Sequence, residues 1–192
     1  GQEGAVPNNK NGCNRQMIEA LQSSLGSHYL YIKFVHVFAV MVWAWSTAVA
    51  YGWYVKGAFL RWSAEPDDPE LIRRRNYAIE QFDRGVILEH VAFPVIIVTG
   101  PLLYLVAGWP ADAPWLLLKL LVVVFVFLPM EGVDYYLSHF GGNKYRLRMR
   151  GESEQYETAI RRHWLFLRVT TPLIVILVPL VIFLSIVKPI LW

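Results

Sequence analysis

The sequence predicts an all-α fold, an integral membrane bundle of four helices. Hydrophobic residues make up 55% of the 192 residues and charged residues only 17%, whereas soluble domains carry about a quarter charged residues. The charges are also grouped between long apolar runs, which excludes a disordered chain and a water-soluble globule. The only cysteine is Cys13, so the chain can form no internal disulfide and no Cys-x-x-Cys-His site for covalent haem.

The N-terminal extension, residues 1–27, is the first element. It is polar and rich in Gly and Asn, and it lacks the apolar core of a signal peptide. A polar tail of this kind rarely orders itself. We therefore expect a partner outside this chain to hold it.

The bundle, residues 28–192, contains four apolar stretches that are long enough to cross a bilayer, which takes about 20 residues. Backbone groups in lipid must bond within their own segment, and no period-two alternation indicates a barrel, so helices are predicted. The lipid bilayer is thus the first expected partner. The spans are expected at about 29–55, 86–107, 115–137 and 164–187.

The connections predict the orientation of these spans. Twelve Lys and Arg residues lie in the two long connections, 56–85 and 138–163, and none lies in 108–114. Because basic residues accumulate in cytoplasmic loops, we expect two long basic cytoplasmic loops and both termini outside, in the inner membrane of a bacterium. The net charge of +3 is explained in the same way, and no nucleic-acid partner is expected.

Within the first long connection, Asp-Pro-Glu at 68–70 combines a helix cap, a first-turn proline and an acid, which predicts a short helix over 69–82 at the membrane surface. The second long connection carries Gly-Gly-Asn at 141–143, followed by alternating basic residues over 144–150. This pattern favours a solvated basic loop beside anionic lipid.

Two ionisable residues lie in the outer parts of the spans, where each charge is costly and needs a reason. His36 is about two turns into the first span, and Lys119 is about one turn into the third. We expect them to share a depth and to face one cavity. The alternatives are that Lys119 extends to the outer surface and that His36 bonds to a neighbouring carbonyl.

A second layer of ionisable residues lies near the cytoplasmic ends of the spans. Glu131 and Asp134 are three apart and share a helix face, and Arg168 on the fourth span is expected to form a structural ion pair with them. Three histidines could instead supply the two axial ligands of a b-type haem. The layer comprises Glu89, His90, Glu131, Asp134, His139, His163 and Arg168, and the candidate ligand pairs are His90 with His163 and His90 with His139.

Zinc is disfavoured because the sequence has no cysteine cluster and no His-Glu-x-x-His pattern. Copper transport is disfavoured because four methionines form no ladder of soft ligands.

Several short motifs carry a family resemblance. In the first span, His36 is followed seven residues later by Trp43. Over residues 28–192 the chain resembles the CopD-like and HemJ-like four-helix membrane proteins, and most of all an uncharacterised branch of predicted integral membrane proteins related to them. The remaining motifs are Phe93-Pro94, Thr99-Gly100, Gly108-Trp109, Pro114-Trp115 and the C-terminal Val187-Lys188-Pro189.

The resemblance implies a chemistry for two residues. HemJ-type proteins are protoporphyrinogen oxidases that bind haem b and depend on a first-helix histidine and a third-helix lysine, positions that His36 and Lys119 occupy here. It implies that His36 is the metal ligand of a haem and that Lys119 is catalytic, next to a haem propionate. A glycine often follows the first-helix tryptophan in these proteins. This chain has Ala44-Trp45 there, which narrows that face.

The sequence therefore predicts a membrane redox protein that handles haem b or a porphyrin, an oxidoreductase if it is an enzyme. One alternative is a non-catalytic accessory subunit packed on a larger, respiratory-type membrane complex, which the many tryptophans favour. Another is a small transporter that uses the inner carboxylates as a proton relay. Other membrane subunits or a second copy of the chain are the expected protein partners.

Overall fold

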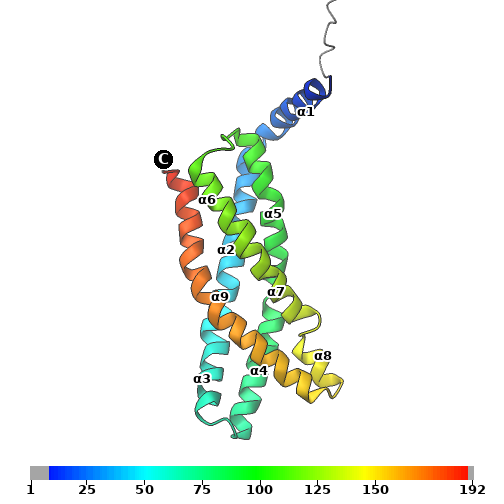
Figure 1. The fold of residues 1–192 in the computed structure, drawn as a ribbon, viewed down its shortest axis with the longest axis vertical. Coiled ribbons are helices and arrows are strands. Elements are labelled where there is room, and N and C mark those ends of the chain that lie inside the picture. Colours follow the sequence, from blue (N-terminus) through cyan, green and yellow to red (C-terminus); the bar gives the residue numbers. More distant parts are fainter. Residues whose placement is uncertain (1–8, 190–192) are drawn as a thin grey trace, which may run out of the picture.

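A computed structural model describes residues 9–189, and this part of the chain is helical, with no strand. A first helix, α1 (Asn9–Gly26), projects from one end of a long bundle of four helical rods (Figure 1). The rods are α2 (Tyr29–Ala50) with α3 (Lys56–Ala64), α4 (Pro69–Gly85) with α5 (Ile87–Ala107), α6 (Pro114–Val122) with α7 (Leu128–His139), and α9 (Ser153–Val187). The short helix α8 (Lys144–Met149) joins α7 to α9.

The four predicted spans are confirmed as helices that are long and apolar enough to cross a membrane, by length and composition. The helices run well beyond the apolar stretches, over 29–64, 69–107, 114–149 and 153–187. Many large apolar side chains face outward from the bundle, such as Phe34, Trp45, Leu121 and Ile176. An apolar outer surface of this kind is suited to lipid.

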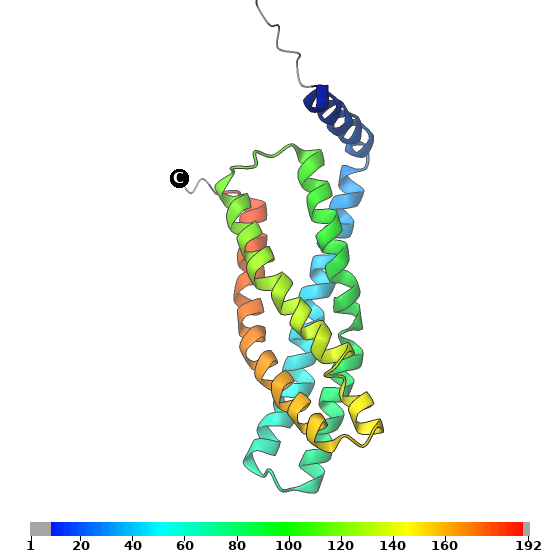
Figure 2. The ribbon, with the colours of Figure 1, turned by 45° about the vertical axis from the view of Figure 1, so that its right-hand side comes forward.

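The two ends of the bundle differ. The end with α1, the α5–α6 connection and the last turn of α9 is called here the terminus end, and the end with the α3–α4 turn and α8 is called the hairpin end (Figure 1). α2 packs along α5, and α6 packs along α9. These two pairs diverge toward the terminus end (Figure 2). Contacts of α9 with α2 and α7 join them further down.

One apolar cluster lies toward the hairpin end of the bundle and another lies in its middle. Toward the hairpin end, Val55, Phe59, Ile79 and Ile160 are fully buried and belong to one apolar cluster. In the middle of the bundle, Trp43 is buried among apolar residues of α2, α5, α7 and α9 and of the segment between α6 and α7. The ring of Trp43 lies 5.0 Å from that of Phe127 and 5.7 Å from that of Phe93, distances typical of favourable aromatic pairs.

Two rods contain a π-helical turn, η1 (Tyr51–Val55) and η2 (Val123–Phe127). A π turn accommodates one extra residue and is frequent at functional sites. The sequence analysis predicted neither turn. They lie where α2 passes into α3 and where α6 passes into α7, and they set which side chains face the core beyond them.

The two long connections differ from the predictions. The helix predicted over 69–82 exists, and Asp68 caps it by accepting bonds from the amides of residues 70 and 71. It does not lie across the bundle, however, but continues into α5 along the long axis (Figure 1), with unbroken backbone bonds around Val86. The predicted solvated loop over 144–150 is mostly helix α8, capped by Asn143.

The N-terminal extension is partly held by this chain itself. The Gln22 side-chain amide donates a bond of 2.8 Å to the Leu105 carbonyl at the end of α5, and α1 also contacts α5. Contacts within the chain therefore help to position the last turns of α1, and an outside partner for the extension stays a prediction.

Candidate functional site

His36 lies on α2 toward the terminus end, and a hydrogen bond fixes the position of its ring proton. Its Nδ1 lies 2.8 Å from the Thr99 hydroxyl on α5. That hydroxyl donates its own proton to the Val95 carbonyl at 2.6 Å, so it can only accept from His36. The imidazole therefore carries its proton on Nδ1, and Nε2 keeps a free lone pair that can bind a metal or accept a proton.

Thr99 and Gly100 together shape the contact between His36 and α5. Thr99 is buried and His36 is half-buried. A Cβ built on Gly100 would lie 3.5 Å from Cε1 of His36, an ordinary van der Waals contact, so the ring lies directly over this glycine. The Thr99-Gly100 motif on α5 thus orients the His36 ring through one hydrogen bond and one close packing contact.

Lys119 lies on α6, in the other helix pair, and is half-buried. It is close enough to His36 for the two side chains to interact electrostatically. That His36 and Lys119 face one cavity at a shared depth stays a prediction.

A second polar cluster is buried toward the hairpin end, with Asp134 of α7 at its centre. One carboxylate oxygen of Asp134 accepts from Nε2 of His163 at 2.9 Å, and the other lies 3.1 Å from Nε2 of His90. His163 is 0% exposed, and the other two are 6% exposed or less. A carboxylate bonded by two imidazoles on two other helices fixes the register of α5, α7 and α9.

Lys144 of α8 closes one side of this cluster and is itself 0% exposed. Its ammonium donates to Oδ1 of Asp83 at 2.8 Å, to the Leu137 carbonyl at 3.0 Å, and to Nδ1 of His163. All three ammonium protons thus have acceptors, which a buried charge requires. From the sequence alone this lysine is expected in a solvated loop, because its pairing with Asp83 depends on a contact between distant helices.

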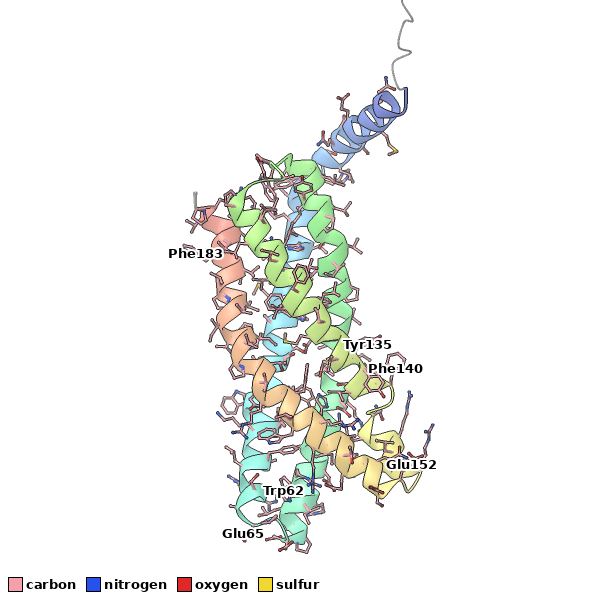
Figure 3. All side chains as sticks on the ribbon, viewed as in Figure 1. Trp62, Glu65, Tyr135, Phe140, Glu152 and Phe183 are labelled. Carbon is pink, nitrogen blue, oxygen red and sulfur yellow. The ribbon has the colours of Figure 1, made fainter. Side chains whose placement is uncertain are left out.

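The other side of the cluster opens toward the surface. Nδ1 of His90 lies 2.7 Å from Nε2 of His139, which is half-buried at the end of α7. The exposed ring of Tyr135 packs edge-on against both imidazoles, at 4.7 Å and 5.2 Å between centroids. Figure 3 shows Tyr135 near the end of α7 that leads to α8.

Two further carboxyl groups lie beside this cluster, deeper in the bundle. Glu131 accepts from the indole N–H of Trp43 at 2.6 Å. Glu89 accepts from the hydroxyl of Thr47. Trp43 and Thr47 are one turn apart on the same face of α2, so the two carboxyl groups that they bind are neighbours along that helix, and both are buried. Neighbouring carboxyl groups in a dry environment disfavour two negative charges.

A further set of polar contacts joins the helices at the hairpin end, outside the buried cluster around Asp134. Arg148 of α8 makes two bonds to Glu80 of α4, at 2.8 Å and 2.9 Å, and the Tyr156 hydroxyl donates to the same carboxylate at 3.0 Å. Arg75 lies 4.4 Å above the ring of Trp62 (labelled in Figure 3) and bonds to α9. These contacts join α3, α4, α8 and α9.

The structure corrects the predicted ion pair. Arg168 forms no salt bridge with Glu131 or Asp134 in the described part of the chain, and its side chain is exposed. The reason is helical geometry: Arg168 is five residues after His163, which turns it about 140° away from the buried face of α9. Asp134 receives its bonds from histidines instead.

The inner histidines do not fit the predicted pair of haem ligands. His90 and His163 both direct Nε2 at the single carboxylate of Asp134, and their Nδ1 atoms contact His139 and Lys144. No ring nitrogen of either is free for iron. No group of three or more His, Cys, Asp or Glu within residues 9–189 could hold a metal ion. His36, with one free nitrogen, fits a single axial ligand.

Comparisons with protein-family models, with curated proteins and with solved structures find no match for this chain. The resemblance to the CopD-like and HemJ-like proteins rests on the sequence motifs.

Proposed function

We propose that this chain is a multi-pass membrane redox protein that binds haem b or a related porphyrin in the terminus half of its bundle. His36 would supply one axial nitrogen, and Lys119 would offset a propionate that lipid cannot solvate. Haem, when bound, supplies one-electron chemistry. If the protein is an enzyme, Lys119 is the catalytic candidate of a protoporphyrinogen-oxidase-like reaction.

The observation that carries this proposal is the Thr99 hydroxyl. Because it donates to Val95 and accepts from Nδ1 of His36, it fixes the tautomer in which Nε2 is free. Metal-binding histidines are typically oriented in this way by a partner on the other ring nitrogen. Lys119 adds a positive charge within electrostatic range of the same ring.

A visible spectrum of the purified full-length chain tests the proposal. With haem supplied, the wild-type protein is expected to show a Soret band and b-type bands on reduction, and His36→Ala should abolish them. His28→Ala is the matched control, because this exposed histidine precedes α2 and should leave the spectrum unchanged. A colourless wild-type protein, or a spectrum that survives His36→Ala, would refute the proposal.

Two further variants separate orientation from ligation. Thr99→Val removes the acceptor for Nδ1 but keeps Nε2, so haem affinity should fall by about 10- to 100-fold without loss of the band shape. Lys119→Met should weaken binding or shift the reduction potential. A Thr99→Val variant with unchanged affinity would show that the bond has no role in haem binding.

The orientation in the membrane is part of the proposal. We propose that the hairpin end faces the cytoplasm of a bacterial cell, since the long connections carry twelve basic residues. In a Cys13→Ser background, Asp112→Cys should react with a membrane-impermeant thiol reagent added to intact cells, and Asn143→Cys should not. The opposite labelling pattern would invert the orientation.

A second candidate function, an accessory subunit of a larger membrane complex, is favoured by α1. This helix projects away from the bundle (Figure 1) and contacts it at the end of α5. Native-size analysis of gently solubilised membranes tests this candidate. The full chain should migrate in a larger complex, and a chain lacking residues 1–26 should be released from it. A full chain that migrates alone would refute this second candidate.

A further inference from the structure

The buried polar cluster toward the hairpin end has a connectivity that a purely structural role does not require. From His139 at the surface, hydrogen bonds lead to His90 and then to Asp134, at 2.7 Å and 3.1 Å. Imidazole and carboxyl groups can each both bind and release a proton. The chain of bonds runs along the bundle axis toward the carboxyl pair.

The contact between the two imidazoles is suited to proton exchange. In an N–H···N bond one nitrogen carries the proton and the other accepts, so Nδ1 of His90 and Nε2 of His139 share one proton between them. Because Nε2 of His90 already directs a proton at Asp134, a proton that arrives at Nδ1 makes His90 an imidazolium. It can then release the proton on the other side.

The charges around His90 and His139 favour the binding of an extra proton by these two imidazoles. Asp83 is neutralised by Lys144, at 2.8 Å. Within the described part of the chain no Lys or Arg forms a salt bridge with Asp134, whose partners are the two imidazoles of His90 and His163. A buried, uncompensated carboxylate attracts one proton to the neighbouring histidines.

His139 is also the member that meets the surface. It is half-buried, and the charged or titratable groups that act on it are His90, Asp83, Asp134 and Arg146. The second branch from Asp134 differs, because it ends at His163 and Lys144, both 0% exposed. The entrance for a proton therefore lies at His139, whose ring contacts that of Tyr135.

The far end of the path is the carboxyl pair. Glu131 is one turn from Asp134 on α7 and interacts electrostatically with Asp134 and His90. Glu89 lies next to it on α5, one residue before His90. These two carboxyl groups, held by Trp43 and Thr47, form a proton-accepting site in the interior of the bundle.

We propose that His139, His90 and Asp134 form a proton-transfer path from the hairpin end to the Glu131–Glu89 pair. His139 first takes up a second proton on Nδ1 from the solvent side and becomes an imidazolium. Its Nε2 proton then passes to Nδ1 of His90, His90 releases its own Nε2 proton to Asp134, and both rings are left neutral with the proton on Nδ1. Asp134 passes the proton through one water molecule to Glu131, and return of the His139 and His90 rings to their first tautomers resets the path. The path serves proton uptake or release at the carboxyl pair and is independent of haem.

Hydrogen–deuterium exchange of the buried carboxyl groups tests the proposal on the full chain without haem. After transfer into D₂O, the infrared C=O band of a protonated carboxylic acid shifts, and its rate of shift reports proton access. The band is assigned to the pair by its loss in Glu131→Gln or Glu89→Gln. We expect His139→Gln to slow the exchange by about 100-fold, the scale of a positioned acid–base group.

Arg148→Gln is the matched control. Arg148 lies at the hairpin end and bonds to Glu80, but it is not a member of the proposed proton path. Its loss loosens the hairpin end, so unchanged exchange in this variant shows that slowing in His139→Gln is specific. Exchange that is equally fast in His139→Gln, or the absence of any carboxyl band assigned to the pair, would overturn the proposal.

A measurement on the unmutated chain keeps the test decisive if His139→Gln does not fold. With ¹⁵N-labelled histidine, a scalar coupling across the N–H···N bond between His90 and His139 is expected in the nuclear magnetic resonance spectrum. Its absence at every pH at which the chain stays folded would overturn the path at its first step. A colourless protein with normal exchange would refute the haem site alone.

Discussion

Lys144→Met is the most informative single test of the polar cluster. The substitution keeps most of the side-chain volume and removes an ammonium that is 0% exposed and has three acceptors. It leaves the carboxylate of Asp83, itself 5% exposed, without its cation. Removing one partner of a buried pair costs about 3–5 kcal/mol, so we expect a loss of this size in the free energy of unfolding.

The measurement is reversible unfolding of the purified chain in mixed micelles, followed by helical circular dichroism. Arg146→Met is the control on the same short helix. Arg146 is exposed, so its loss should change the free energy by about 0.5 kcal/mol or less. Adding Asp83→Asn to Lys144→Met should restore about 2 kcal/mol, because the orphaned charge is removed. A double variant that equals the sum of the singles would refute the pairing.

Three further predictions use the same unfolding measurement. Gly142→Ala should destabilise the chain by about 1–3 kcal/mol, because its Cβ would lie 2.7 Å from the Leu137 carbonyl oxygen, a backbone atom; an unchanged value would contradict the tight turn. Trp43→Phe should cost about 1–3 kcal/mol by leaving the buried Glu131 without its indole donor, and no loss would mean that another donor replaces it. Arg168→Leu should change stability by about 0.5 kcal/mol or less, since this side chain is exposed and makes no ion pair with the α7 carboxylates; a large loss would restore the pairing predicted from sequence.

The four long helices could be predicted from sequence because a membrane imposes a strong constraint. Only a helix satisfies its backbone bonds in lipid, and about 20 apolar residues are needed to cross. The capping residue Asp68 likewise signals the start of α4 locally. What the sequence did not reveal is that the second polar connection is helical too. The stability of α8 depends on contacts between distant helices, such as Arg148 with Glu80.

The candidate sites, too, could be predicted from the sequence only in part. His36, Lys119 and the inner ionisable residues are visible because charged groups are rare in apolar spans. Their partners are not visible, because pairing depends on which face each helix presents. The role of Thr99 depends on the packing of α5 on α2. The burial of Lys144 likewise depends on the packing of α8 against α9.

The two π turns have a consequence for the comparison of this chain with distant proteins. A π turn holds one residue more than the α-helical segment it replaces, while the flanking helices keep their faces. A relative with regular helices would therefore be one residue shorter between His36 and Phe59, and one residue shorter between Lys119 and Glu131. An alignment should place single gaps within 51–55 and 123–127, since a gap-free alignment would pair core positions with lipid-facing ones in half of each rod.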